Sequence, residues 1–249
     1  MSEQSKILLN AWIKHPISRR SLFTSVAIGA FASTSIGRAM GVTSPVVNQV
    51  LGRPTNNSIA ISVLTSENLS AYVEYGYTKT RYTGKSSPMD IQSGIPGVID
   101  LVGLKENSKV YYRIRYKKSG SSTFDTANQY SFMTSRKAGT TFSFSVQGDT
   151  HPERAGQMFN ADLYKVTMAN IVSQQPDFHI LLGDDFSIDP LLSKGQGTQE
   201  NIEKIYKTHR EWLSISGASV PIFLVNGNHE QAAAYLLDGT NTNPCCLSW

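Results

Sequence analysis

The chain has 249 residues, of which 40% are hydrophobic and 17% are charged, a composition that excludes a wholly disordered protein and allows one large domain or two smaller ones. Its net charge of +4 comes from residues 1–40, because the remainder holds as many acidic as basic residues. No basic patch outside that segment calls for a polyanion, so we expect no nucleic acid as a stable partner.

The two cysteines of the chain are adjacent, at Cys245 and Cys246. Neighbouring cysteines bond to each other only with strain, so the sequence predicts no disulfide framework. A zinc site built from cysteines would need a second pair, which the chain lacks. Any metal site must therefore use Asp, Asn and His side chains.

Residues 1–41 have the features of an export signal. The segment Ser18-Arg19-Arg20-Ser21-Leu22-Phe23 leads into a run of apolar and small residues that ends at Ile36, too short and too weakly apolar to predict a stable membrane span. It resembles the twin-arginine signal, with Leu22 and Phe23 in exchanged order. The resemblance implies passage through the twin-arginine export machinery, cleavage near Ala39-Met40-Gly41, and a periplasmic or secreted protein. A membrane anchor and a cytosolic amphipathic tail are the alternatives.

Residues 42–137 are predicted to form an all-β sandwich. Apolar and polar side chains alternate over residues 59–63, 71–75 and 110–116, and turn clusters rich in Gly, Pro, Asn and Ser separate these segments. Short strands at regular spacing are typical of a sandwich. The run Leu101–Arg113 resembles the fibronectin type III corner, which implies that the hydroxyl of Tyr111 or Tyr112 bonds back to the preceding loop.

Residues 138–249 change to alternating strands and helices. Strand-like runs at 142–146, 178–182 and 221–225 are separated by two helical segments, which predicts a parallel or mixed sheet flanked by helices, with chemistry at the carboxyl ends of its strands.

The side chains expected on the inner face of each helix follow from helical spacing. They are Phe159, Leu163 and Val166 for the first helix, and Ile202, Ile205, Tyr206 and Leu213 for the second. Thr198 is expected to cap the second helix. His179 and His209 fall on apolar faces and are expected to be core histidines with satisfied hydrogen bonds.

Each of the three strands ends in a glycine followed by side chains that can bind metal. The endings are Gly148-Asp-Thr-His151, Gly183-Asp184-Asp185 and Gly227-Asn-His-Glu230. This order resembles the calcineurin-like metallophosphoesterase family over about residues 142–230. With the sandwich in front, the layout is also similar to purple acid phosphatases. The purple subgroup has glycine in place of His151 and a metal-binding tyrosine in place of Ser187, so we expect no iron–tyrosinate colour.

The resemblance implies an exported hydrolase of phosphomonoesters or phosphodiesters that uses two metal ions, such as iron, zinc or manganese. Asp149 and His151 would bind the first metal, Asp184 would bridge both, and Asn228 would bind the second. His229 would be the catalytic residue that gives a proton to the leaving oxygen.

Two further acidic residues are candidates for supporting these ligands. Asp185 would support a ligand or cap a helix. Glu230 would cap a helix expected at Gln231–Leu237 or orient His229.

The family completes its metal site with two later histidine motifs, and no histidine follows His229 in this chain. We therefore expect a truncated domain, the N-terminal part of the hydrolase. Such a chain should bind metal weakly, expose apolar sheet surface, and be poorly active or inactive. A genuine short form, a non-catalytic remnant, and a cell-surface binding or adhesion module built on the sandwich are the alternatives.

Overall fold

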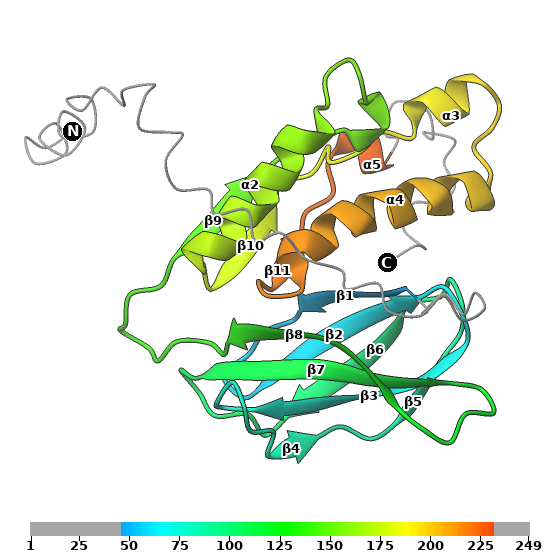
Figure 1. The fold of residues 1–249 in the computed structure, drawn as a ribbon. Helices are drawn as coiled ribbons and strands as arrows, with labels where there is room; N and C mark the ends of the chain where they lie inside the picture. Colours follow the sequence, from blue (N-terminus) through cyan, green and yellow to red (C-terminus); the bar gives the residue numbers. More distant parts are fainter. Residues whose placement is uncertain (1–45, 232–249) are drawn as a thin grey trace, which may run out of the picture. The chain divides into compact units, whose positions relative to one another are not determined.

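The computed structural model describes residues 46–231 (Figure 1). The predicted export signal, the two cysteines and most of the predicted helix Gln231–Leu237 lie outside the described residues. The described residues all belong to one compact unit. Within the described range, no helix has the length and apolarity needed to cross a membrane.

The N-terminal half is an antiparallel β-sandwich of two sheets, which confirms the predicted fold class. The first sheet has the order β1-β2-β6 and consists of β1 Val47–Gly52, β2 Ser58–Thr65 and β6 Gly97–Val102. The second has the order β4-β3-β7-β8, with β5 also paired to β3. Its strands are β3 Leu69–Gly76, β4 Gly84–Lys85, β5 Met89–Ile91, β7 Lys109–Lys118 and β8 Asp125–Met133. Because side chains alternate along each strand, every second residue of β7 from Val110 to Tyr116 is buried in the core between the sheets.

The predicted tyrosine corner is wrong for Tyr112, and within residues 46–231 the Tyr111 hydroxyl makes no hydrogen bond to the preceding loop either. Tyr112 is fully buried, and its hydroxyl donates a 2.7 Å hydrogen bond to the carbonyl oxygen of Ala218 rather than to a loop of the sandwich. Ala218 is the C-cap of α4 (Gln199–Gly217), where helix carbonyls lack intrahelical partners. The loop N–H of Lys105 is held instead by the hydroxyl of Tyr77, at 3.0 Å. Burial raises the pKa of the Tyr112 hydroxyl well above its ordinary value.

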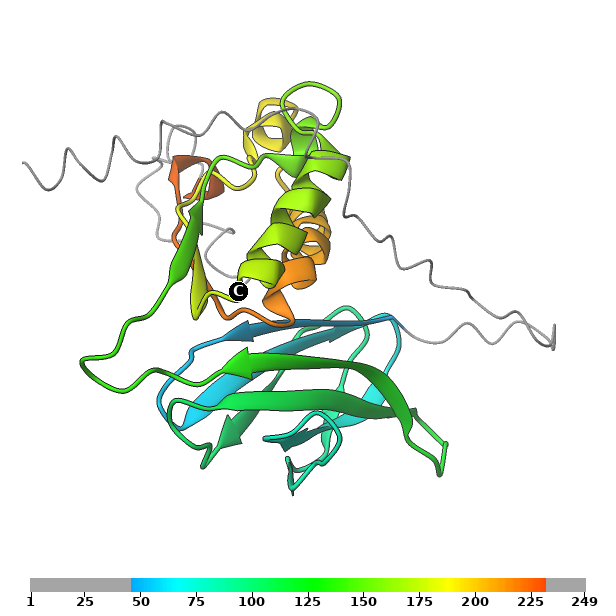
Figure 2. The same ribbon diagram turned by 60° about the vertical axis from the view of Figure 1, so that its left-hand side comes forward.

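The C-terminal part is a three-stranded parallel sheet in the order β11-β10-β9, as the alternation of strands and helices predicts. Its strands are β9 Phe144–Gln147, β10 Phe178–Leu181 and β11 Ile222–Leu224. The helices are η2 Pro152–Arg154, α2 Ala161–Gln174, α3 Asp189–Ser193, α4 Gln199–Gly217 and α5 Asn228–Gln231. Figures 1 and 2 show α2 and α4 on the same side of this sheet.

The inner face of α2 differs from the predicted one. Phe159 is buried, but Leu163 and Val166 are 64% and 54% exposed. The buried positions in the helix are Tyr164, Met168 and Ile171. Apolar residues occupy more than one side of this helix, so the spacing alone fits two faces, and packing against Val220 and Trp212 selects the second.

The predicted start and inner face of α4 are confirmed. The Thr198 side chain accepts a hydrogen bond from the Asn201 N–H, the geometry of an N-cap. Ile202, Tyr206 and Leu213 are buried, and Ile205 packs against the cluster that contains Ile202 and Tyr206.

The sandwich and the parallel sheet share a small apolar core. Val50 of β1 packs against Leu181, Leu213 and Ile222. Beside it, the Arg210 guanidinium donates a 2.8 Å hydrogen bond from Nη2 to the Ser62 carbonyl oxygen in β2. Together with the bond from Tyr112, these contacts connect α4 to the sandwich.

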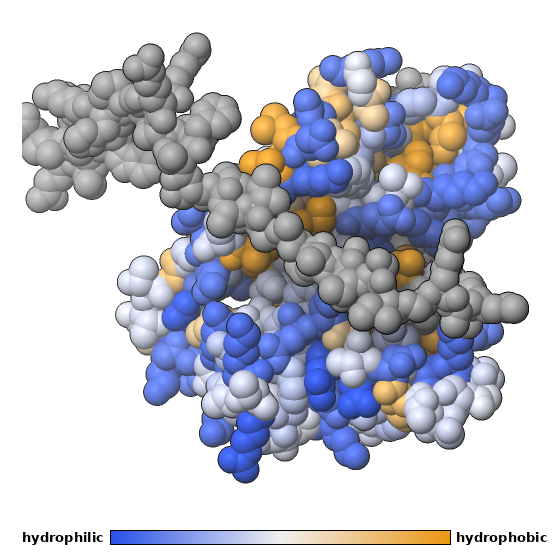
Figure 3. Space-filling view, viewed as in Figure 1, coloured by the Kyte–Doolittle hydropathy of each residue, from blue (hydrophilic) through white to orange (hydrophobic). Residues whose placement is uncertain are grey.

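The face of the parallel sheet opposite α2 and α4 is apolar and open to solvent among the described residues. Phe144 and Val146 are 51% and 48% exposed, and Phe223 is 42% exposed. The ring of Phe178 stacks on Phe144 at 5.4 Å and meets Phe223 edge-on at 5.5 Å. In Figure 3 the visible surface of the sandwich is mainly blue and white, whereas larger orange areas lie on the α/β part. The expected exposure of apolar sheet surface is confirmed.

Candidate functional site

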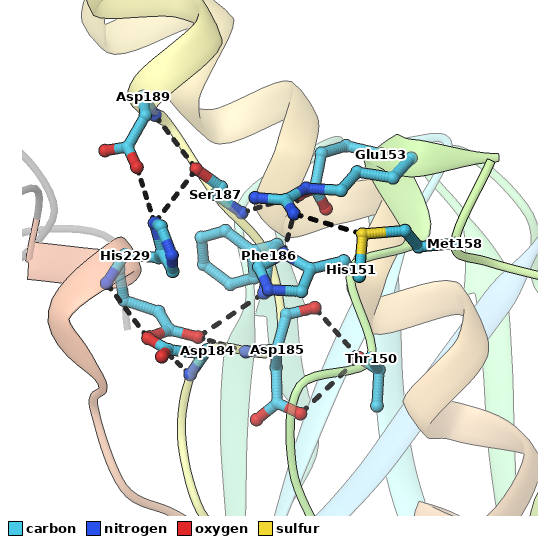
Figure 4. A network of polar contacts seen from close by, with 12 residues as sticks. Thr150, His151, Glu153, Met158, Asp184, Asp185, Phe186, Ser187, Asp189 and His229 are labelled. Carbon is cyan, nitrogen blue, oxygen red and sulfur yellow. Dashed lines mark hydrogen bonds and ion pairs between the residues drawn. The ribbon is translucent and has the colours of Figure 1, made fainter.

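The three loops that follow the parallel strands meet at one edge of the sheet, as parallel strands require (Figure 4). The Asp149 N–H donates to the Gly183 carbonyl oxygen at 3.3 Å, and the His151 N–H donates to that of Asp185 at 3.0 Å. The third loop joins through the His229 N–H, which donates to Asp184 Oδ1 at 3.0 Å. The structure therefore brings these loops together in the way that the spacing of the motifs predicts.

The backbone of these loops is strained. Asp149, His151 and Asp184 have φ of 55°, 46° and 53°, in the left-handed region that side chains with a Cβ rarely adopt. Such conformations cost about 1–3 kcal/mol each and persist where surrounding contacts enforce them, often at functional sites. A Cβ on Gly183 would collide with the backbone of Gly227, so the second and third loops pack backbone against backbone.

His151 is held by a carboxylate that the motifs do not include. Its side chain is buried, and its Nδ1 lies 2.9 Å from Glu153 Oε1. The same oxygen accepts a 3.0 Å hydrogen bond from the Ser187 N–H. Because Nδ1 is engaged, Nε2 is the ring nitrogen left to bind a ligand, an arrangement typical of metal-binding histidines.

His229 is held in the same way. Its Nδ1 lies 2.5 Å from Asp189 Oδ2 and 3.4 Å from Ser187 Oγ. Its ring stands edge-on to that of His151, with 5.4 Å between the ring centroids. Two neighbouring imidazoles, each with a carboxylate at Nδ1, thus meet edge to face in the site (Figure 4).

The two acidic residues expected to support the site are buried beneath it. Asp185 is 3% exposed, and burial together with the neighbouring Glu230 carboxylate raises its pKa to about 8. Its carbonyl oxygen accepts a 2.8 Å hydrogen bond from Thr150 Oγ1. Glu230 is also 3% exposed, and its carboxylate accepts hydrogen bonds from backbone N–H groups.

The described side chains suit a metal by chemistry but do not enclose one. Asp, Asn and His are the donors expected for iron, zinc or manganese. Yet Asp149 and Asn228 are exposed, and between residues 46 and 231 no group of three or more His, Cys, Asp or Glu gathers around a point that could hold a metal ion.

Sequence reasoning missed Glu153, Ser187 and Asp189, which hold the two histidines. Glu153 follows His151 by two residues, and Asp189 follows Asp184 by five. An acidic residue shortly after a motif was therefore the feature of the sequence that could have indicated a partner for each histidine. His179 and His209 are buried as predicted, at 0% and 1% exposure. The expectation of satisfied hydrogen bonds is only partly right. Ser145 Oγ lies 2.8 Å from His179 Nδ1, but His179 Nε2 and both ring nitrogens of His209 have no partner in the described part of the chain.

Comparison with known proteins supports the resemblance at the level of fold. No family model matches the sequence. No curated protein matches it either. The structure is similar to that of purple acid phosphatase PPD1 from yellow lupin (Lupinus luteus) seeds, with a TM-score of 0.56 and 15% identity over 76% of this chain. It is also similar to PhoD, with a TM-score of 0.52 and 13% identity over 74% of this chain. The aligned part spans 36% and 39% of those two proteins.

Proposed function

We propose that this chain carries part of a phosphoric ester hydrolase that works with two metal ions, such as iron, zinc or manganese. The observation that carries the proposal is the pair of adjacent imidazoles, His151 and His229, each held at Nδ1 by a carboxylate, with the His229 N–H bonded to Asp184 Oδ1. The similarity in fold to a purple acid phosphatase supports the same reaction class. Ligands beyond the described residues would have to complete the metal site.

Within this proposal, His229 is the group that gives a proton to the leaving oxygen of the ester. Its Nδ1 is engaged by Asp189, so the ring can present Nε2 to a substrate without rotating. Asp189 acts by fixing the orientation of the ring. The bond from the His229 N–H to Asp184 Oδ1 sets the distance between the proton donor and the proposed bridging ligand.

We also propose that the protein is periplasmic or secreted, because Arg19 and Arg20 precede an apolar run in the manner of a twin-arginine signal. A fusion of residues 1–45 to a reporter should be exported, and the same fusion carrying Lys in place of both arginines should stay in the cytoplasm. Export that does not depend on the two arginines would contradict this route.

A second candidate is a non-catalytic relative of such enzymes. Two observations favour it: the described residues contain no group of three metal-binding side chains, and one face of the parallel sheet is open to solvent. In that case the strand-end loops would be retained for folding, and binding would be the work of the sandwich.

Hydrolysis of p-nitrophenyl phosphate and of bis(p-nitrophenyl) phosphate, measured with added Mn²⁺, Zn²⁺ or Fe²⁺, separates the two. We expect slow hydrolysis that Asp184→Ala reduces by about 100-fold or more, as for the loss of a group used in the transition state. The matched control is Asp162→Ala, because the Asp162 side chain is 93% exposed on α2. Hydrolysis unaffected by Asp184→Ala would remove the proposed site. Neither hydrolysis nor bound metal, measured by elemental analysis, would favour the non-catalytic relative.

A further inference from the structure

The carboxylate of Glu230 is bonded to the second and the third strand-end loops at once. Its Oε2 accepts hydrogen bonds from the N–H of Asp184 at 2.8 Å and of Gly227 at 2.9 Å. Its Oε1 accepts from the N–H of Asp185 at 2.5 Å and of Phe186 at 3.4 Å. The side chain lies in α5, while three of these four donors belong to the loop that follows β10.

This buried carboxylate has no basic side chain paired with it among residues 46–231. A buried negative charge is costly unless hydrogen-bond donors replace the lost water. The backbone N–H groups provide that replacement here, as in other anion-binding turns of the main chain. The same bonds leave little freedom to the segment that donates them.

We propose that Glu230 is a positioning residue that ties the end of β10 to the end of β11 and thereby sets the geometry between Asp184 and His229. Glu230 holds the backbone of Asp184 in its left-handed conformation, with φ of 53°. Asp184 Oδ1 in turn accepts from the His229 N–H, and His229 precedes Glu230 in the chain. The bonds thus close a ring between the two loops.

Capping of its own helix explains only part of this arrangement. The Glu230 side chain reaches back three residues to accept a hydrogen bond from the Gly227 N–H, which is the geometry of a capping box at the start of α5. The other bonds go to Asp184, Asp185 and Phe186, which lie 46, 45 and 44 residues away in the chain. Helix capping alone does not account for the hydrogen bonds from these three N–H groups.

Amide hydrogen exchange, followed by NMR on the metal-free chain, tests the proposal directly. The N–H groups of Asp184, Asp185 and Gly227 have no backbone acceptor within the described residues, so Glu230 is what should protect them. In the wild type we expect slow exchange at all three. Fast exchange there would overturn the proposal without any variant.

Glu230→Gln is the first variant, because one carboxylate oxygen becomes an NH₂ group that cannot accept a hydrogen bond. The oxygen that remains can still accept, so we expect exchange at least about tenfold faster on one side of the former carboxylate: either at Asp184 and Gly227, which share Oε2, or at Asp185, which bonds to Oε1. The Val225 N–H, which donates to the Leu181 carbonyl oxygen, is the internal control and should not change. Unchanged exchange at the three amides would overturn the proposal. If Glu230→Gln does not fold, the same exchange rates measured in Glu230→Asp, whose shorter side chain moves the carboxylate away from these amides, and in the wild type test the proposal instead.

The consequence for metal binding rests on the proposed function, so it needs a separate readout. Titration with Mn²⁺ should show affinity about 10-fold or more weaker in Glu230→Gln, as for other groups that orient metal ligands. Met168→Ala, in the fully buried core of α2, is the control for loss of stability alone and should leave the affinity within about twofold. Equal losses in both variants would mean that Glu230 acts only on stability. Wild-type Mn²⁺ binding indifferent to Asp184→Ala would instead contradict the proposed function, and amide exchange would still decide the role of Glu230.

Discussion

The two sheets of the sandwich bury their apolar faces against each other, whereas the parallel sheet β9-β10-β11 covers one face with α2 and α4 and leaves the other open in the described structure. In β2 the alternate residues Ile59, Ile61 and Val63 are at most 1% exposed, while in β9 the alternate residues Phe144 and Val146 are about half exposed. The same period of two therefore produces a closed core in one region and an open apolar surface in the other. The alternation in the sequence shows which side chains share a face of the sheet. Whether that face is buried depends on whether another sheet or a helix packs against it.

The two regions differ also in how their loops are built. The residues with left-handed backbone in the strand-end loops are Asp149, His151 and Asp184, whose side chains are the proposed ligands. The sandwich contains Arg53 and Asn107 in the same region of φ, at ordinary turns between strands. The strand-end loops therefore differ from these turns because their strained residues are the proposed ligands and lie beside Glu153, Asp189 and Glu230, whose carboxylates accept hydrogen bonds there.

The largest change in stability is expected for a substitution in the closed core of the sandwich. Ile61→Ala in β2 removes a fully buried side chain and should lower the free energy of unfolding by about 2–5 kcal/mol, the usual cost of such a cavity. Urea denaturation measures it. Val102→Ala in β6, where the side chain is 68% exposed, is the control and should change stability by less than about 0.5 kcal/mol. Equal, small losses would mean that the sandwich core is not closed.

The next largest effect is expected from His209, which packs on the Phe186 ring and whose pKa burial lowers to about 3. Between pH 6.5 and pH 3 the unfolded chain binds a proton at this residue that the folded chain does not. Folding stability should therefore fall as the pH falls, by about 1.4 kcal/mol per pH unit from this residue.

Comparing the wild type with His209→Leu isolates this contribution. Urea denaturation at pH 7.5 and at pH 5 should show a loss that is smaller in the variant by about 2 kcal/mol, which corresponds to the 1.5 pH units below the pKa of an unfolded histidine. The same loss in both proteins would show that His209 is accessible to protons in the folded state.

A smaller loss of stability is expected for a substitution at the contact between the sandwich and α4. Tyr112→Phe removes the hydrogen bond to the Ala218 carbonyl oxygen and leaves a buried acceptor without its partner, so it should cost about 1–2 kcal/mol. Tyr111→Phe is the matched control, because the Tyr111 side chain is only partly buried. If Tyr111→Phe proves the more costly of the two, the link between the sandwich and α4 is not made by Tyr112.

The smallest change in stability, under about 1 kcal/mol, is expected on the open face. Phe144→Thr keeps a residue suited to strands but removes an aromatic ring that is 51% exposed. Its effect should appear instead as weaker fluorescence of the apolar dye ANS, which binds exposed apolar surface. Val102→Thr, at a 68% exposed position of the sandwich, should leave ANS fluorescence unchanged. Unchanged fluorescence in Phe144→Thr would show that this face is covered in solution.

Much of this protein follows from its sequence alone. Alternation predicted β2, β3 and β7 of the sandwich, the apolar run Phe178–Leu182 predicted a strand of the parallel sheet, and Thr198 marked the start of α4. The three glycine-containing endings predicted that Asp149, Asp184 and His229 lie at one edge of that sheet. These inferences succeed because side-chain alternation along a strand and helix capping depend on residues that are close in the chain, and because parallel strands end at the same edge of a sheet.

Tertiary structure alone decided the rest. It selected the inner face of α2, joined the Tyr112 hydroxyl to Ala218, placed Glu153 and Asp189 on the two histidines, and set Glu230 across two loops. Tyr112 and Ala218 are 106 residues apart, and Glu230 and Asp184 are 46 apart. Local periodicity cannot predict such pairs, because a hydrogen bond between distant residues depends on strand register and helix packing to within a few tenths of an ångström.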